Sequence, residues 1–175
     1  MTSSPNSLVT LAAGCFWCVE AVLAQVDGVL SARSGFMGGH TENPTYRDIC
    51  TIDTGHAEVV QVEYDAAKLS LEQLLDWFWR LHDPTTLNRQ GADVGSQYRS
   101  AIFAHSDQDL ALAEASLAAK EASGDFQDPI VTVVSRAETF YPADEGHDDY
   151  YARNKDQGYC RNVIAPKLKQ LDLES

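Results

Sequence analysis

The sequence predicts an α+β fold, a two-layer sandwich in which helices pack on a mixed, mainly antiparallel sheet. Its 175 residues are 44% hydrophobic and 22% charged, which is typical of one soluble globular domain with a sizeable core. Strand-like and helix-like segments are mixed without strict alternation, and this favours a two-layer sandwich over a doubly wound sheet. We therefore expect a single domain over residues 1–175, in which residues 155–175 form a C-terminal tail.

A strand, a turn and a helix are expected near the N-terminus. Residues 8–13 form an apolar run with the length of a buried strand. After Gly14, apolar residues recur at helical spacing from Cys15 onward, so Cys15 lies in the first turn of a helix. Unpaired backbone N–H groups and the helix dipole favour an anion there. We expect the pKa of the Cys15 thiol to be lowered, which favours the reactive thiolate.

Two more strands and a second helix are expected before residue 82. Residues 29–37 form a strand that ends at paired glycines, and residues 57–64 alternate as an amphipathic strand does. The polar segment 40–55 between them contains one helical turn. Ser70 caps a helix that runs to residue 81, because acidic and amide residues occupy its first turn and its apolar residues share one face.

The second half of the chain continues this mixture. Residues 82–97 are irregular, and residues 98–104 and 130–137 are predicted strands. Residues 106–123 are the clearest helix, rich in alanine, leucine and glutamate and followed by a glycine. A polar helix is expected over residues 143–154. Long irregular segments in a compact domain are usually functional.

Charge and cysteine content narrow the class of protein. A net charge of −13 argues against nucleic acid or an anionic membrane as the main partner. The four cysteines, at positions 15, 18, 50 and 160, are too few and too unevenly spaced for a disulfide framework. No apolar run approaches the ~18–20 residues of a membrane helix. We expect a cytoplasmic monomer.

Cys15 and Cys18 form a C-x-x-C pair that opens a helix after a strand, a thioredoxin-like redox arrangement. A zinc ribbon needs a second such pair, and the sequence has none. Phe16 and Trp17 place two aromatic surfaces beside the sulfur that suit a small apolar group. Taken alone, the segment also fits a buried, unreactive cysteine among core aromatics.

Glu58 begins a strand dominated by valines. It is either an exposed carboxylate at a strand edge or a partly buried acid whose raised pKa lets it donate a proton. Several tyrosines lie in or beside irregular segments, and near a nucleophilic cysteine such a group can hydrogen-bond a developing oxyanion. These tyrosines are Tyr46, Tyr98, Tyr141, Tyr150 and Tyr151.

Four separated motifs resemble those of the A-type peptide methionine sulfoxide reductases. The motifs are Gly14-Cys15-Phe16-Trp17-x-x-Glu20, Pro44-Thr45-Tyr46 with Thr54-Gly55-His56-Ala57-Glu58, Asp93-Val94-Gly95-Ser96-Gln97-Tyr98-Arg99-Ser100, and Tyr159-Cys160-Arg161-x-Val163-Ile164-x-Pro166-Lys167. The last is similar to the C-terminal cysteine segment of one branch. The resemblance covers residues 8–169 and implies a ferredoxin-like core in a single catalytic domain. It also implies reduction of methionine S-sulfoxide, free or in proteins, without metal or organic cofactor.

The resemblance also implies a role for each matching residue. Cys15 is the nucleophile, and Phe16 and Trp17 form the pocket for the substrate methyl group. A disulfide formed after the reaction is reopened by thioredoxin. The polar residues implied around the sulfoxide oxygen are Glu58, Tyr46 and Tyr98, with Asp93 nearby, and the implied resolving thiol is Cys160.

Two thiols are candidates for resolution, because Cys18 stands where many family members have glycine. We expect Cys160 to act first, since a tail with a glycine at position 158 can approach along the S–O bond, whereas Cys18 faces the body of the domain. A Cys15–Cys18 disulfide is the minor route. The segment around His147 departs from the family pattern, so His147 is given no role. The alternative function is a thioredoxin-like thiol–disulfide oxidoreductase that uses Cys15 and Cys18, which leaves Glu58 unexplained.

Overall fold

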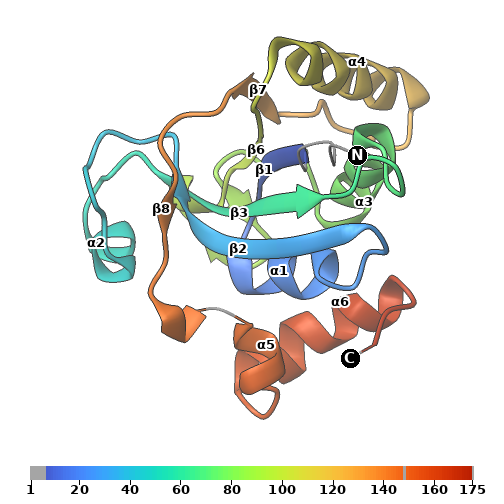
Figure 1. The fold of residues 1–175 in the computed structure, drawn as a ribbon. Coiled ribbons are helices and arrows are strands. Elements are labelled where there is room, and N and C mark those ends of the chain that lie inside the picture. The colour runs from blue at the N-terminus through green and yellow to red at the C-terminus, as the bar shows by residue number, and fades with distance from the viewer. Residues whose placement is uncertain (1–6, 148, 175) are drawn as a thin grey trace, which may run out of the picture.

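The structure is built on one six-stranded sheet (Figure 1). It is a computed structural model that describes residues 7–147 and 149–174. The strands are β1 (Ser7–Ala13), β2 (Val29–Met37), β3 (Ala57–Tyr64), β6 (Ser100–Ala104), β7 (Val133–Arg136) and β8 (Tyr141–Pro142). Their order is β7-β6-β1-β3-β2-β8. Neighbours run antiparallel, except for the parallel pair β6 and β7.

Four strands and two helices form a ferredoxin-like core. Helix α1 (Phe16–Leu23) connects β1 to β2, and helix α3 (Leu71–Leu81) connects β3 to β6. The central order β6-β1-β3-β2 is antiparallel throughout. Apolar residues of both helices belong to one buried cluster with residues of β1 and β3. This arrangement confirms the predicted α+β sandwich.

Alternate side chains of β3 point to opposite faces of the sheet. Val60 and Val62 belong to the core under the helices, whereas Ala57 and Val59 belong to a smaller buried cluster on the other face. Glu58 shares the parity of Val60. The pleat of the strand therefore directs its carboxyl toward the layer that contains α1.

Shorter elements complete the chain. They are α2 (Tyr46–Thr51), β4 (Arg89–Gln90), β5 (Asp93–Val94), η1 (Ser96–Tyr98), α4 (Asp107–Ser123), η2 (Glu145–His147), α5 (Tyr150–Arg153), η3 (Cys160–Ile164) and α6 (Ala165–Gln170). The C-terminal helices lie outside α1, on the side away from the sheet (Figure 1). No helix in the described parts of the chain is long and apolar enough to cross a membrane.

Several predicted elements are confirmed together with their ends. Strands β2 and β3 have the predicted bounds. The Ser70 hydroxyl accepts the backbone N–H of Gln73 and begins α3, and Ser106 does the same for Asp109 at the start of α4. Gly124 ends α4 with φ of +74°, the left-handed conformation that glycine adopts readily.

Other segments differ from the prediction. Residues 82–97 contain the β4–β5 hairpin, and the strands expected over 98–104 and 130–137 are shorter. The helix expected over residues 143–154 is replaced by the 3₁₀ turn η2 and the short helix α5, and position 148 lies outside the described residues. Asp149, with φ of +49°, precedes α5 in a left-handed conformation that does not continue a helix.

The C-terminal segment, predicted as a tail over residues 155–175, is helical and packed. Ile164 and Leu168 are fully buried in the main core, and their spacing of four residues places them on one helical face. Pro166 lies in the first turn of α6, directly after the π-helical turn η3, and the chain continues from one into the other with helical backbone angles. The hydrophobic effect thus holds this segment against α1.

Candidate active site

Cys15 lies at the turn between β1 and α1. Gly14 makes this turn with φ of +94°, and an added Cβ would lie 2.8 Å from side-chain atoms of Gln90. Cys15 is the N-cap residue of α1, one position before the first helical turn where the sequence predicts it. Its carbonyl accepts the backbone N–H of Cys18 at 3.1 Å, so the two cysteines flank one turn. The Cys15 side chain is buried, at 8% exposure.

Glu58 is a buried acid beside this turn, only 1% exposed. Its Oε1 accepts the backbone N–H of Phe16 at 3.1 Å, whereas its buried Oε2 has no hydrogen-bond partner among the described residues. Burial raises the pKa of Glu58 to about 8, the charge of Asp93 adds to the shift, and the Phe16 N–H opposes it. Of the two interpretations that the sequence left open, this burial agrees with the buried acid and not with an exposed carboxylate at a strand edge. Glu58 therefore carries a proton at neutral pH, and one of its two oxygens has no partner among the described residues.

Burial reverses the shift predicted for Cys15. Removal from water raises the pKa of the thiol well above its ordinary range, and the charge of Glu58 raises it further. The backbone N–H of Trp17 and the Tyr159 hydroxyl oppose this shift but do not cancel it. The predicted lowering is wrong because the end of one short helix contributes less than desolvation. A proton on Glu58 removes a neighbouring negative charge and makes the thiolate easier to form.

Tyr46 and Tyr98 reach the same site from two different segments. Tyr46 opens α2, Tyr98 closes η1, and both are half-buried. Burial raises the pKa of both phenols, the charge of Glu58 raises it further, and that of Cys15 also contributes. Both hydroxyls therefore lie in the field of the carboxyl and the thiol and keep their protons. They are donors of the kind that bind a ligand oxygen.

Polar side chains hold the loop that leads to Tyr46. Thr45 accepts the N–H of Asp48 at 3.1 Å, and the Asp48 carboxylate accepts the N–H of Thr45 at 3.0 Å, a capping box. The buried His56 accepts the N–H of Gly39 at 3.0 Å, and its other ring nitrogen lies 2.6 Å from the carbonyl of Thr41. These bonds fix the start of α2 beside β3.

Tyr159 is a site residue that the analysis of single residues missed. Its hydroxyl donates to Oδ2 of Asp93 at 2.7 Å and lies within hydrogen-bonding reach of the Cys15 thiol. The structure thus connects Asp93 to the Cys15 thiol through this phenol. The only signal for Tyr159 in the sequence is its position directly before Cys160 in the C-terminal motif.

The two predicted aromatic pocket residues differ in exposure. Phe16 is fully buried, with its ring 5.6 Å from that of Phe36 and 6.0 Å from that of Tyr46. Trp17 is half-buried, stacks on Tyr150 with a centroid separation of 3.8 Å, and donates its indole N–H to Nδ1 of His147 at 3.0 Å. Trp17 therefore presents the more accessible surface.

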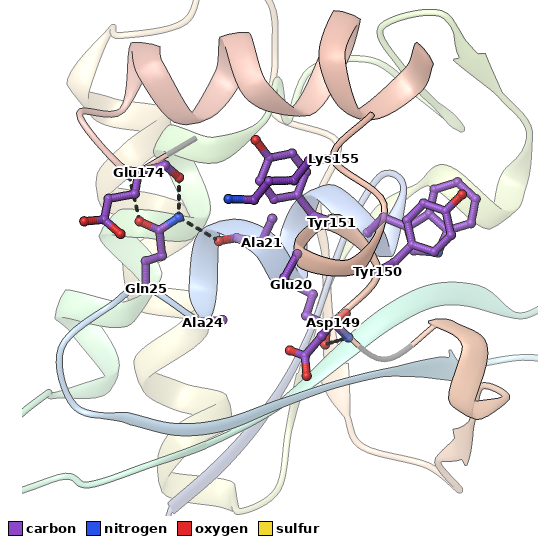
Figure 2. A pocket seen from close by; sticks show the side chains of 11 residues that line it. Glu20, Ala21, Ala24, Gln25, Asp149, Tyr150, Tyr151, Lys155 and Glu174 are labelled. Carbon is purple, nitrogen blue, oxygen red and sulfur yellow. Dashed lines mark hydrogen bonds between the residues drawn. The ribbon is translucent and has the colours of Figure 1, made fainter. Parts of the chain in front are cut away.

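Glu20 hydrogen-bonds to the segment that contains Tyr150, the residue that stacks on Trp17. This buried carboxylate accepts the Ser34 hydroxyl at 3.0 Å and the backbone N–H of Asp149 at 3.1 Å. Figure 2 shows Glu20 on α1 directed toward Asp149, with Tyr150 and Tyr151 on the helix that follows. A cavity of about 190 Å³ lies between these elements. Glu20 thus positions the Tyr150 ring that stacks on Trp17.

A second cavity, of about 260 Å³, contains both cysteines of α1. It is lined by Ala13, Cys15, Cys18, Gln90, Gly91, Ala92, Asp93, Tyr159, Val163 and Lys167. Cys18 is 4% exposed, and Cys160 is fully buried in η3. Cys50 is exposed on α2. All four cysteines are free thiols.

The arrangement suits reduction of a bound group that carries an oxygen. A thiol supplies the nucleophile, a protonated carboxyl supplies the acid, and phenols supply hydrogen-bond donors. Among residues 7–147 and 149–174, no cluster of three histidine, cysteine or acidic side chains could hold a metal ion.

Comparison with known proteins points to the same chemistry. The family model described as "Peptide methionine sulfoxide reductase" matches residues 7–175. The peptide methionine sulfoxide reductase MsrA of Natronomonas pharaonis is 53% identical over 164 residues, which cover 94% of this chain and 92% of that protein.

Solved structures agree with the sequence comparison. Mxr1 from Saccharomyces cerevisiae in its reduced form has a TM-score of 0.83 and 36% identity, and the match covers 91% of each chain. Mxr1 in complex with Trx2 has a TM-score of 0.59 and 28% identity, over 86% of this chain and 89% of that one. This chain, with its buried cysteine, acid and phenols, belongs to the peptide methionine sulfoxide reductase family.

Proposed function

We propose that this enzyme reduces methionine S-sulfoxide, free or in oxidised proteins, with Cys15 as nucleophile and Glu58 as acid. The observation that carries the proposal is the Oε2 atom of Glu58, which is buried without a partner in the described chain and belongs to a carboxyl that is protonated at neutral pH. A buried polar atom is costly unless it is hydrogen-bonded, so the site is prepared for an oxygen from a ligand.

In the proposed reaction, the sulfur of Cys15 attacks the sulfoxide sulfur while Glu58 protonates the oxygen. The Cys15 sulfur bonds to the substrate sulfur, the S–O bond breaks, and the oxygen leaves as water after gaining one proton from Glu58 and one equal to that lost by the thiol. Water then attacks the Cys15 sulfur, the S–S bond breaks, methionine leaves, and the proton released returns to Glu58, so that Cys15 ends as a sulfenic acid. The sulfoxide is reduced, the cysteine is oxidised, and no net proton is taken up or released. Tyr46 and Tyr98 donate hydrogen bonds to the oxygen, and Asp93 acts through Tyr159.

The substrate methyl group is placed against Trp17, with Phe16 packed beneath it. With the oxygen directed to Glu58 and the tyrosines, one epimer alone presents its sulfur to Cys15. The family resemblance identifies that epimer as S.

The sulfenic acid is resolved by a second thiol. The sequence argument favoured Cys160 as the first thiol, but the contacts favour Cys18, which shares the cavity and one helical turn with Cys15. The Cα atoms of such a pair lie within the range that a disulfide spans. Cys160 needs local unwinding of η3 before it can reach the site. We propose that Cys18 acts first and that Cys160 then exchanges into the disulfide.

Thioredoxin is the proposed reductant. The structurally similar Mxr1 has been solved in complex with Trx2, which supports a docking of this kind. A disulfide that opens and closes in each cycle requires a steady supply of reductant, which a reducing compartment such as the expected cytoplasm provides.

The proposal is tested by supplying the separated S and R epimers of methionine sulfoxide with dithiothreitol and following methionine by chromatography. We expect consumption of the S epimer alone and no product from Cys15→Ser, because a hydroxyl is a far weaker nucleophile than a thiolate. Equal consumption of both epimers would contradict the site geometry. A thioredoxin-like carrier, the alternative function, would reduce neither epimer.

A further inference from the structure

The cavity that contains Cys15 and Cys18 also contains one basic side chain. Among its described lining residues, Lys167 alone carries a positive charge and Asp93 alone a negative one. Lys167 comes from α6, far from the cysteines in sequence. Nothing in the first chemical step requires a cation on this side of Cys15.

Core packing holds Lys167 in place. Its neighbour Leu168 and the preceding Ile164 are fully buried, so this face of α6 is anchored. Lys167 itself is half-buried and also lines an adjacent cavity of about 350 Å³ that borders His82. Its side chain therefore borders both the His82 region and the cavity that contains the two cysteines.

Lys167 acts on Cys18 in particular. Burial raises the pKa of the Cys18 thiol, and the charge of Lys167 and a hydrogen bond from its ammonium group lower it. Asp93 raises it, and Cys15 and Tyr159 are the other titratable groups that line the cavity. Lys167 is thus the group in this cavity that offsets the cost of ionising Cys18.

We propose that Lys167 is a positioning residue that stabilises the Cys18 thiolate when it forms and attacks the sulfenic acid on Cys15. This inference rests on the proposed function. In the step, the Cys18 sulfur forms a bond to the Cys15 sulfur, and the S–O bond of the sulfenic acid breaks. Cys15 is reduced from the sulfenic level, and Cys18 is oxidised. The oxygen leaves as water, and the proton that it gains balances the proton that the Cys18 thiol lost.

The size of the expected effect follows from thiol chemistry. Each unit of increase in the pKa of a resolving thiol lowers its thiolate fraction about tenfold at neutral pH, but the more basic thiolate is about threefold more nucleophilic. The net loss is about three- to fourfold in rate for each unit. Replacement of Lys167 by an uncharged residue therefore slows disulfide formation by about three- to tenfold at pH 7, and less at high pH.

The test is a single-turnover experiment on the full chain with one equivalent of S-sulfoxide and no reductant. Aliquots are quenched with an alkylating agent, methionine is measured by chromatography, and the Cys15–Cys18 disulfide is measured by mass spectrometry. We expect Lys167→Met to release methionine at the parental rate but to form this disulfide more slowly. Lys167→Arg should restore most of the rate, and Lys169→Met, an exposed charge on the same helix, should match the parent.

A second readout does not depend on turnover. In a variant whose only cysteine is Cys18, thiolate absorbance near 240 nm is followed against pH, and Lys167→Met should raise the midpoint while Lys169→Met does not. Equal midpoints and equal disulfide rates in parent and Lys167→Met would overturn the inference, as would formation of the first disulfide with Cys160 alone. If the parent releases no methionine, the proposed function fails, and the midpoint still decides whether Lys167 stabilises the Cys18 thiolate.

Discussion

Glu58 shows how a single residue can be costly to the fold and useful to the site. Strand parity and the packing of α1 remove its carboxyl from water, and one backbone N–H is the only hydrogen-bond donor to it among the described residues. An ionised carboxylate there would be unfavourable, so the group holds its proton to about pH 8. Burial of Glu58 thus lowers the stability of the fold and also keeps the carboxyl protonated, as the proposed acid requires.

Replacement of Glu58 by glutamine should slow methionine formation in the first turnover by about 10²–10⁴-fold at pH 7, the usual contribution of a positioned proton donor. The carboxyl is protonated below about pH 8 and loses its proton above it. The ratio of parental to variant rate should therefore fall as pH rises through 8. Rapid-quench kinetics from pH 6 to 10 measure this ratio, and a ratio near one at every pH would make Glu58 a bystander.

The same substitution should change the pH dependence of stability. The native carboxyl binds a proton to about pH 8, whereas in the unfolded chain it titrates near its ordinary value of 4.5. The native state thus binds more protons in this window, and the free energy of unfolding falls as pH rises from 4.5 to 8. Between pH 6 and pH 9 the Tm of the parent should therefore fall further than the Tm of Glu58→Gln. The difference between the two decreases is expected to be on the order of 5 °C. If the Tm difference between parent and variant is the same at pH 6 and at pH 9, the stability of the protein is not linked to the titration of Glu58.

At the scale of elements, the β1–α1 turn depends on Gly14. Both the positive φ and the nearby Gln90 side chain exclude a Cβ, and Gln90 cannot move aside easily because its amide bonds the backbone of Asp83 at both ends. Gly124 offers a matched control, since its φ is also positive but no atom lies within 4 Å of an added Cβ.

We expect Gly124→Ala to lower the free energy of unfolding by about 1 kcal/mol and to leave the first turnover unchanged. Gly14→Ala should cost more stability and also slow the first turnover, because the turn carries Cys15. Urea titration and rapid-quench kinetics on both variants measure the two effects. Parental activity in Gly14→Ala would show that the turn tolerates a shift without moving the thiol.

At the scale of the whole molecule, the C-terminal segment closes over α1 and brings Tyr159 and Lys167 to the thiols. Cys160 lies in the same segment but is buried. The proposed order of resolution follows from this difference in access. A thiol that is already in the cavity reacts before one that requires opening of η3.

Disulfide mapping after one equivalent of S-sulfoxide should detect Cys15–Cys18 first and disulfides of Cys160 later. Cys160→Ser should retain the first disulfide but lose thioredoxin-driven turnover, whereas Cys18→Ser should accumulate sulfenic acid, which a dimedone reagent traps. Normal resolution in Cys18→Ser, with a direct Cys15–Cys160 disulfide, would restore the order expected from sequence.

Local sequence determined the fold class and most of the elements. The strands at 29–37 and 57–64 and the capped helix 71–81 follow from apolar periodicity and from Ser70, which act over a few residues. The proposed nucleophile and acid could also be chosen from sequence, because Cys15 and Glu58 lie in motifs with recognisable spacing. Such features depend on chain neighbours, and they are visible without coordinates.

Tertiary structure alone decided the pKa shifts in the site and which residues of the C-terminal segment lie beside Cys15 and Cys18. The pKa of Cys15 was predicted with the wrong sign because burial depends on segments distant in sequence, which outweigh the local helix end. Tyr159, Lys167 and the packed C-terminal helices come to α1 only through the core contacts of residues such as Ile164. Contacts between distant segments arise from burial of shared apolar surface, and periodicity along the chain does not record which surfaces meet.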